Sequence, residues 1–362
     1  MRREQVSMQM IVLALILIAV GCTGQEQPGG DKPPSREDEQ TVYEVWANEL
    51  RIPWAIASAG ETYYVTERPG TIVQITQDSQ VRQQVQLARP VAAQGEGGLL
   101  GLVLAPDFAD SKEAYVYHTY EAEGGVFNRI VMIREEDGRW DESHVLLEGI
   151  PGSYIHNGGR LAIGPDGHLY ATTGDFNEEE QAQELDSLGG KILRMTLAGE
   201  VPSDNPIPGS YIYSYGHRNP QGLTWDSNGQ LYSAEHGPSG SPGGHDEINR
   251  IEQGANYGWP LVIGDDIQSG LQPPLYHTGQ TAIAPSGIAA ADTYLYVAAL
   301  RGEVLLRYDL ESAELEPVLQ GEGRIRDVWV QESDLYIITN NTDGRGRPGA
   351  GDDRMLKLSI MK

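Results

Sequence analysis

The chain of 362 residues contains a single cysteine, Cys22, and half as many basic as acidic residues. With one cysteine no intrachain disulfide can form, so we expect packing and bound metal to stabilise the fold. The 26 Lys and Arg residues stand against 52 Asp and Glu residues, which gives a net charge of -26. Such a chain has too little positive charge to neutralise a nucleic-acid backbone, so we expect no nucleic-acid partner.

Several sequence motifs that carry well-known chemistry are also absent. The sequence has no CxxC, no HExxH, no EF-hand spacing and no phosphate-loop glycine pattern. Haem attachment through that motif, zinc hydrolysis and nucleotide chemistry therefore have no support. Long amphipathic helical windows are missing too, so helices are not expected to dominate the fold.

The N-terminus predicts export. Arg2 and Arg3 precede the apolar stretch "MIVLALILIAVGC", which is too short for a comfortable membrane span and ends like a bacterial lipoprotein processing site. We expect residues 1–22 to be a signal peptide ending at a lipidated Cys22, which would anchor the protein outside the cytoplasm, on the outer face of the membrane. The alternative is an ordinary signal peptide with a chance cysteine, because Ala19 stands where such sites more often carry leucine.

Two further segments follow the signal peptide. Residues 23–40 contain no apolar side chain larger than proline, so they predict a flexible linker. Residues 41–362 are the expected folded domain.

One sequence pattern recurs along this domain. It consists of an apolar strand, a polar turn and a second strand centred on tyrosine. Its six copies carry equivalent tyrosines, which are Tyr64, Tyr117, Tyr170, Tyr232, Tyr296 and Tyr336. Turns such as "PDGH" and "DSNGQ" supply the residues that tight hairpins need. Further β-rich segments follow several of these hairpins and complete units of four strands.

The repeat predicts an all-β fold, a six-bladed β-propeller of four-stranded antiparallel blades. A β-sandwich or another all-β fold is the alternative. We expect the terminal strands, residues 41–47 and 354–360, to pair in one blade and close the ring.

Candidate functional residues lie in the loops at the strand ends, which converge on the central channel of a propeller. In so acidic a chain, arginines at successive loop ends indicate a pocket for a polyanionic small molecule, because guanidinium groups pair with carboxylates. They are Arg218, Arg301, Arg324 and Arg326. The alternative is that each arginine bonds an acidic neighbour.

Six motifs, in order, make a more specific pattern: "IHNGGRLAIGPDG", "LGGKILRM", "YGHRNPQGL", "DEINRIEQGANYGWP", "APSGIA" and "GRIRDV". From about Thr41 to the C-terminus the chain resembles the soluble quinoprotein glucose/sorbosone dehydrogenase family, in particular its bacterial aldose dehydrogenase branch. The resemblance implies a six-bladed propeller that binds pyrroloquinoline quinone (PQQ) and Ca²⁺. It also implies oxidation of an aldose at C1 to the lactone, with electrons passed to an external acceptor.

The resemblance also implies roles for individual residues. His156 would be the general base that takes the proton of the C1 hydroxyl, and Arg218 would polarise the quinone oxygen. A structural role for His156 is the alternative. The residues expected to bind the cofactor are Glu96, Asn219, Arg301, Arg324 and Arg326. Glu96 stands where the family has a glutamine, and its charge would repel a tricarboxylate unless it is protonated or paired.

Calcium ligands follow from the same resemblance. Gly237 and Pro238 would give backbone carbonyls to the Ca²⁺ that also holds PQQ, since calcium prefers oxygen ligands. A second, structural Ca²⁺ would be bound by the side chain of Glu247 with Asp246 and Tyr257.

Two other functions remain open at this point. A Ca²⁺-dependent propeller lactonase would use the same channel but has no need of the arginine set. A non-catalytic ligand-binding propeller is the third possibility, and Glu96 is the main argument for it.

Overall fold

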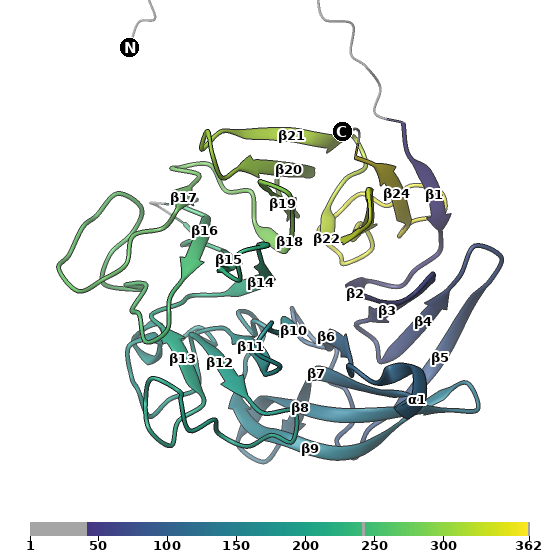
Figure 1. Cartoon of the computed structure of the whole chain (residues 1–362), viewed down its shortest axis with the longest axis horizontal. Helices are drawn as coiled ribbons and strands as arrows, with labels where there is room; N and C mark the ends of the chain where they lie inside the picture. The colour runs from purple at the N-terminus through teal and green to yellow at the C-terminus, as the bar shows by residue number, and fades with distance from the viewer. Residues whose placement is uncertain (1–41, 241–242, 361–362) are drawn as a thin grey trace, which may run out of the picture. The chain divides into compact units, whose positions relative to one another are not determined.

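Short antiparallel strands follow one another through the part of the chain that the computed structural model describes, residues 42–240 and 243–360 (Figure 1). The chain divides into two units, Met1–Gln40 and Thr41–Lys362, and the fold concerns the second. The predicted signal peptide and linker lie outside the described residues. The described helices, α1 (Phe108–Ser111) and the 3₁₀ helix η1 (Glu179–Ala182), are one turn each. None of them is long and apolar enough to cross a membrane.

Four of the sheets contain four strands each, with consecutive strands antiparallel. One consists of β10 (Leu161–Ile163), β11 (Leu169–Thr173), β12 (Lys191–Met195) and β13 (Ile212–Tyr215). The next consists of β14 (Pro220–Trp225), β15 (Leu231–Glu235), β16 (Glu247–Ile251) and β17 (Tyr276–His277). A third consists of β18 (Pro285–Ala291), β19 (Tyr294–Ala299), β20 (Val304–Asp309) and β21 (Leu315–Gln320).

The fourth sheet joins the two ends of the folded unit. It contains β22 (Ile325–Gln331), β23 (Asp334–Thr339), β24 (Met355–Ser359) and β1 (Glu44–Ala47). In the β1–β24 pair Glu44 lies opposite Lys357 and Val45 opposite Leu356. The expected pairing of the terminal strands is thus confirmed.

The remaining sheet has eight strands, which form two antiparallel runs of four. The first run is β2 (Pro53–Ala59), β3 (Thr62–Glu67), β4 (Thr71–Ile75) and β5 (Gln80–Gln86). The second run is β6 (Leu99–Leu104), β7 (Glu113–Ala122), β8 (Gly125–Glu136) and β9 (Arg139–Pro151). The runs meet where Gln84–Gln86 pairs in parallel with Arg139–Asp141. This junction was not expected, and it joins the outermost strand of one run, β5, to the outermost strand of the other, β9.

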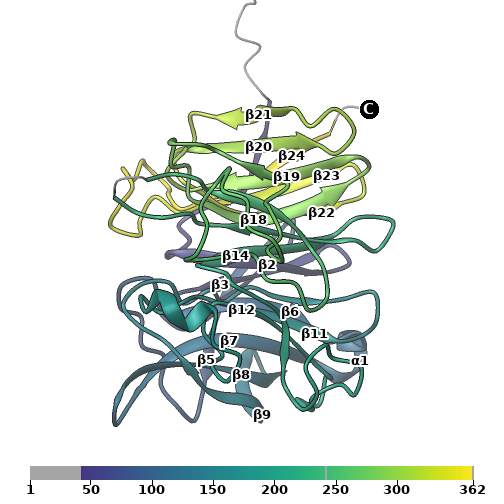
Figure 2. The same cartoon turned by 90° about the vertical axis from the view of Figure 1, so that its left-hand side faces the viewer.

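The sheets are arranged around a centre, with the first strand of each run innermost (Figure 1). These inner strands are β2, β6, β10, β14, β18 and β22. From the side, β18, β19, β20 and β21 lie one above another, so that this sheet extends outwards from the centre (Figure 2). Loops entering the inner strands therefore meet near the axis.

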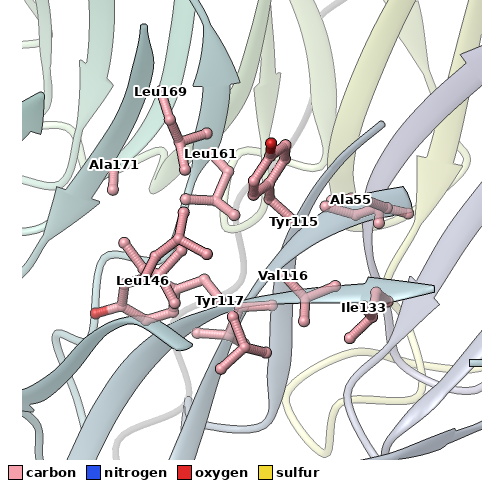
Figure 3. Close-up of a cluster of buried hydrophobic side chains, with 14 of the residues drawn as sticks. Ala55, Tyr115, Val116, Tyr117, Ile133, Leu146, Leu161, Leu169 and Ala171 are labelled. Carbon is pink, nitrogen blue, oxygen red and sulfur yellow. The ribbon is translucent and has the colours of Figure 1, made fainter. Parts of the chain in front are cut away.

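Apolar side chains fill the space between neighbouring sheets. The repeated tyrosines all lie in the second strand of a run and are all buried, from 0% exposure at Tyr117 to 7% at Tyr64. Tyr117, Leu146, Leu161 and Leu169 gather in one cluster although they come from two sheets (Figure 3). Alternating strand residues thus build the core, and the repeat in the sequence is the repeat of this packing.

Candidate active site

A cavity of about 820 Å³ opens among the loops that enter inner strands and the loops that join the second and third strands of three runs. Eight residues proposed from the sequence line it, namely Glu96, His156, Arg218, Gly237, Pro238, Asp246, Arg301 and Arg324. The other four, Asn219, Arg326, Glu247 and Tyr257, are not in its lining. Loops from all around the ring therefore contribute to one polar space.

His156 lies in the wall of this cavity and is held by a buried carboxylate. Its Nδ1 is 2.7 Å from Oδ1 of Asp175, a residue with 0% exposure that directly follows Gly174 after β11. Asp175 Oδ2 accepts a hydrogen bond of 2.9 Å from the indole N–H of Trp259. A carboxylate on Nδ1 fixes the proton there and leaves Nε2 as the acceptor, so the imidazole is oriented as a base.

The backbone of His156 is also constrained. Its φ of +56° is in the left-handed region, which non-glycine residues seldom adopt. The His156 N–H donates to Oε2 of Glu96 at 3.0 Å. Its carbonyl oxygen lies so close to Gly174 that a Cβ there would be 2.0 Å away. The histidine is thus placed by both neighbouring loops.

Arg218 is a buried guanidinium without an acidic partner among the described residues. Its Nη1 donates to the His236 carbonyl at 3.4 Å and its Nη2 to Ser239 Oγ at 3.2 Å, and both bonds are long. The group lies 5.4 Å from the centre of the Trp259 ring. Burial lowers the pKa of Arg218, which means that its positive charge lacks full compensation in the protein.

The other three arginines differ in how far the protein satisfies them. Arg324 forms an ion pair of 3.0 Å with Asp343. Arg326 donates to Gln221 Oε1 at 2.8 Å and contacts no described carboxylate, and burial lowers its pKa to about 9. Arg301 is exposed at the cavity and makes no side-chain hydrogen bond to a described residue.

Four buried side-chain nitrogens at the site have no hydrogen-bond partner in the described part of the chain. They are Arg218 Nε, Asn219 Nδ2, Arg326 Nε and His236 Nε2. Buried donors are normally satisfied, because leaving one unpaired costs about 1–3 kcal/mol. Three of them can only donate or are cationic, so the set suits a ligand rich in carboxylate and carbonyl oxygens.

Glu96 forms an ion pair, which is one of the two conditions under which its charge would be compatible with a tricarboxylate ligand. Its Oε1 accepts from Arg345 Nη1 at 2.8 Å while Oε2 accepts from His156. Burial by itself would raise the pKa of Glu96, but His236, Arg345 and the His156 N–H lower it to about 2. Burial also lowers the pKa of His236 to about 4, so at neutral pH Arg345 is the charged neighbour of an ionised Glu96.

The residues expected to bind the cofactor's calcium lie together on the cavity wall. Gly237 packs so closely that a Cβ would be 2.2 Å from the Gly244 carbonyl oxygen. Both Asp246 oxygens accept backbone N–H groups, from Gly237 at 2.8 Å and from Ile283 and Ala284 at 2.6 and 2.8 Å. The carbonyls of Gly237 and Pro238 accept no hydrogen bond from described residues, and such carbonyls suit calcium.

The second expected calcium site is less assembled. Glu247 lies opposite Glu235 in the β15–β16 pair, and burial together with this carboxylate raises the pKa of Glu247 to about 8. The Tyr257 hydroxyl instead donates to the Arg250 carbonyl at 2.7 Å. Within residues 42–240 and 243–360, no group of three or more His, Cys, Asp and Glu side chains has the arrangement of a metal site.

Three residues at the site were not singled out from the sequence. Asp175 and Trp259 orient His156, and Arg345 pairs with Glu96. Asp175 ends a glycine-aspartate turn and so carried a weak signal, whereas Arg345 lies between β23 and β24, outside the arginines and motifs singled out from the sequence. What the sequence could not indicate is which residue each of them contacts.

The radial sheets and the arginine-lined cavity define a class of protein, all-β rings with a cationic cavity at the centre. The model of the glucose/sorbosone dehydrogenase family matches residues 50–348. The chain therefore belongs to the glucose/sorbosone dehydrogenase family.

Individual relatives agree with this family. The chain is similar to the aldose sugar dehydrogenase YliI of Escherichia coli, with 29% identity covering 83% of this chain and 90% of that one. It is 35% identical to quinoprotein glucose dehydrogenase B of Acinetobacter calcoaceticus over 57% of this chain and 49% of that one. The PQQ-bound aldose sugar dehydrogenase of Streptomyces coelicolor superposes with a TM-score of 0.82, at 39% identity over 88% of this chain and 97% of that one.

Proposed function

We propose that this protein is a PQQ- and Ca²⁺-dependent dehydrogenase that oxidises the C1 hydroxyl of an aldose to the lactone. The observation that carries the proposal is the oriented His156–Asp175 pair beside buried arginine and asparagine donors without partners in the described chain. The relatives named above support the choice of PQQ and of an aldose. When bound, PQQ accepts a hydride at its quinone.

His156 performs the proton transfer in this proposal. Its Nε2 takes the proton of the C1 hydroxyl, and the buried Asp175 stabilises the imidazolium that forms. The fixed Nδ1 contact means that the imidazole need not reorient during the reaction. Arg218 would donate hydrogen bonds to the quinone oxygen, where negative charge develops. Because the guanidinium is already in place, it would stabilise this charge without moving during the reaction.

Other residues bind the cofactor. Arg326, Arg324, Arg301 and Asn219 provide donors for carboxylate and carbonyl oxygens, and the Gly237 and Pro238 carbonyls hold the Ca²⁺. A second Ca²⁺ at Glu247 would relieve the repulsion between Glu247 and Glu235, with Asp246 and Tyr257 nearby in the chain.

We also infer a six-bladed propeller, in which the eight-stranded sheet counts as two blades joined through β5 and β9. The sixfold tyrosine position supports this count. The protein would be held outside the cytoplasm by a lipid on Cys22 and a linker over residues 23–40, and would pass electrons to an external acceptor.

Reconstitution tests this function. The purified apoprotein is mixed with PQQ and Ca²⁺, and reduction of a dye is followed with several aldoses. We expect sugar-dependent reduction that needs both additions. Hydrolysis of a lactone without PQQ would instead indicate a lactonase, and absence of both activities would indicate a ligand-binding protein.

A variant tests the assigned base. We expect His156→Ala to lower kcat by about a thousandfold, the usual scale of a lost general base, while PQQ still binds. Steady-state kinetics and PQQ titration measure the two effects. Full activity of this variant would show that the base is elsewhere.

A further inference from the structure

A line of contacts along one wall of the cavity connects Arg324, Asp343, Arg345, Glu96 and His156, and we call it the Glu96 brace. Asp343 Oδ2 accepts from Arg324 Nη2 at 3.0 Å, and Asp343 Oδ1 accepts from the backbone N–H of Arg345 at 2.8 Å. The Arg345 side chain then pairs with Glu96 at 2.8 Å, and Glu96 accepts from the His156 N–H at 3.0 Å. The brace thus joins an expected cofactor-binding arginine to the backbone of the expected base.

Without a cationic partner, Glu96 would weaken the binding of an anionic ligand in this cavity. It lines the same space as the arginines, with 18% of its side chain exposed. A carboxylate there repels an anionic ligand and weakens the field of the neighbouring guanidinium groups. Arg345 is the one cation in an ion pair with Glu96 among the described residues, so it carries the compensation.

Arg345 is placed for more than this one bond. It lies between β23 and β24, whereas Glu96 lies between β5 and β6, a separation of 249 residues in the chain. Half of its side chain is exposed and it lines the cavity, so further N–H groups of its guanidinium remain free for a ligand oxygen.

We propose that Arg345 is a positioning residue of the active site, which neutralises Glu96 and holds it against the His156 N–H. This inference rests on the proposed function for its ligand, PQQ, but the ion-pair geometry stands independently of it. The consequence is that the charge at position 96 is tolerated only while Arg345 is present. The pair would therefore replace the neutral side chain that the family resemblance places at position 96.

A double-mutant cycle tests this inference, with PQQ affinity of the apoprotein in Ca²⁺ as the first readout. We expect Arg345→Met to weaken PQQ binding by about tenfold, the scale of one uncompensated charge near an anionic ligand. Adding Glu96→Gln to that variant should restore most of the affinity, because it removes the charge that Arg345 neutralised. Arg347→Met is the matched control, since Arg347 is exposed on the same loop and its side chain forms no hydrogen bond or ion pair with a described residue.

The thermal unfolding midpoint of the same apoproteins is the second readout. Glu96→Gln should raise the midpoint in the Arg345→Met background and lower it, or leave it unchanged, in the wild type. Additive effects of the two substitutions on both readouts would overturn the proposal. They would mean that the Arg345–Glu96 contact is a surface ion pair without influence on the site. If the wild type bound no PQQ, the proposed function would fail, and the midpoints would still decide whether Arg345 neutralises Glu96.

Discussion

At the scale of single residues, the site depends on groups that the protein holds in unusual states. His156 has a left-handed backbone and a buried carboxylate on Nδ1. Arg218 and Arg326 are buried without an ion-pair partner in the described chain, at an energetic cost that a bound anion would offset. Residues kept in costly states commonly mark functional sites, and of these three His156 and Arg218 line one cavity.

Asp175 offers a test that separates orientation from binding. Asp175→Asn keeps the size of the side chain but removes the charge that fixes the His156 proton on Nδ1. We expect kcat to fall by about ten-thousandfold, because the histidine is then held in the wrong tautomer. PQQ affinity should stay near the wild-type value, because Asp175 is not in the cavity lining. Glu178→Gln, an exposed acid nearby, serves as control, and an equal loss there would contradict this role.

His118 predicts a pH dependence of stability. It is fully buried, and burial together with Arg129 lowers its pKa to about 4. Between that value and the unfolded pKa of about 6.5, the unfolded chain binds more protons, so stability rises with pH in this window and is lost as pH falls. His118→Gln should remove about 3 kcal/mol at most of this dependence.

Denaturant unfolding from pH 7 to pH 4 measures the difference. His144→Gln, in which an exposed histidine is replaced, is the control and should follow the wild type. Parallel curves for wild type and His118→Gln would mean that His118 has the same pKa in the folded and unfolded states.

At the scale of elements, β1 is the outermost strand of its sheet and depends on β24 from the other end of the chain. Trp46 packs edge-on against Tyr63 and Tyr336, at ring distances of 6.3 and 5.7 Å. Lys357 of β24 lies 5.1 Å from the Trp46 ring. The strand thus contributes apolar contacts as well as backbone hydrogen bonds.

Removal of residues 1–47 should therefore lower the thermal midpoint and cause aggregation, because it exposes the edge of β24 and the faces of Tyr63 and Tyr336. Removal of residues 1–40 should leave the midpoint unchanged. Calorimetry and light scattering on the two shortened chains measure this. Equal midpoints would show that the ring does not need its closing strand.

At the scale of the whole molecule, acidic residues outnumber basic ones two to one, for a net charge of -26. The excess acidic side chains repel one another in the folded state, which lowers its stability, and ion pairs cannot offset all of this repulsion. Raising NaCl from about 0.01 M to about 0.15 M shortens the screening length from about 30 Å to about 8 Å. We expect the unfolding midpoint to rise over this range, whereas a fall would mean that attractive surface pairs dominate.

The sequence predicted most of the fold because the fold repeats. Each repeated tyrosine lies in the second strand of a run of four strands. Because the same hairpin pattern occurs six times, each occurrence supports the assignment of the others. The terminal strands followed from the same logic, since a ring must close. The parallel contact of Gln84–Gln86 with Arg139–Asp141 could not be predicted, because it depends on how far two strands extend.

For the site, the sequence predicted residue types better than partners. Eight of the twelve proposed residues line one cavity, four of them on loops that enter inner strands and four on loops between the second and third strands of a run. The pairing of Glu96 with Arg345 was not predictable, because the two are 249 residues apart and only the closed ring brings them together. Asp175 was likewise visible in the sequence without its contact to His156.

The pairing of the first strand with the last also sets the order in which the molecule can be completed. β1 can pair only when β24, which ends at Ser359, is present. The pairing therefore needs almost the entire folded unit. Closing the ring therefore requires both ends of the folded unit, and no shorter part of it can complete this sheet.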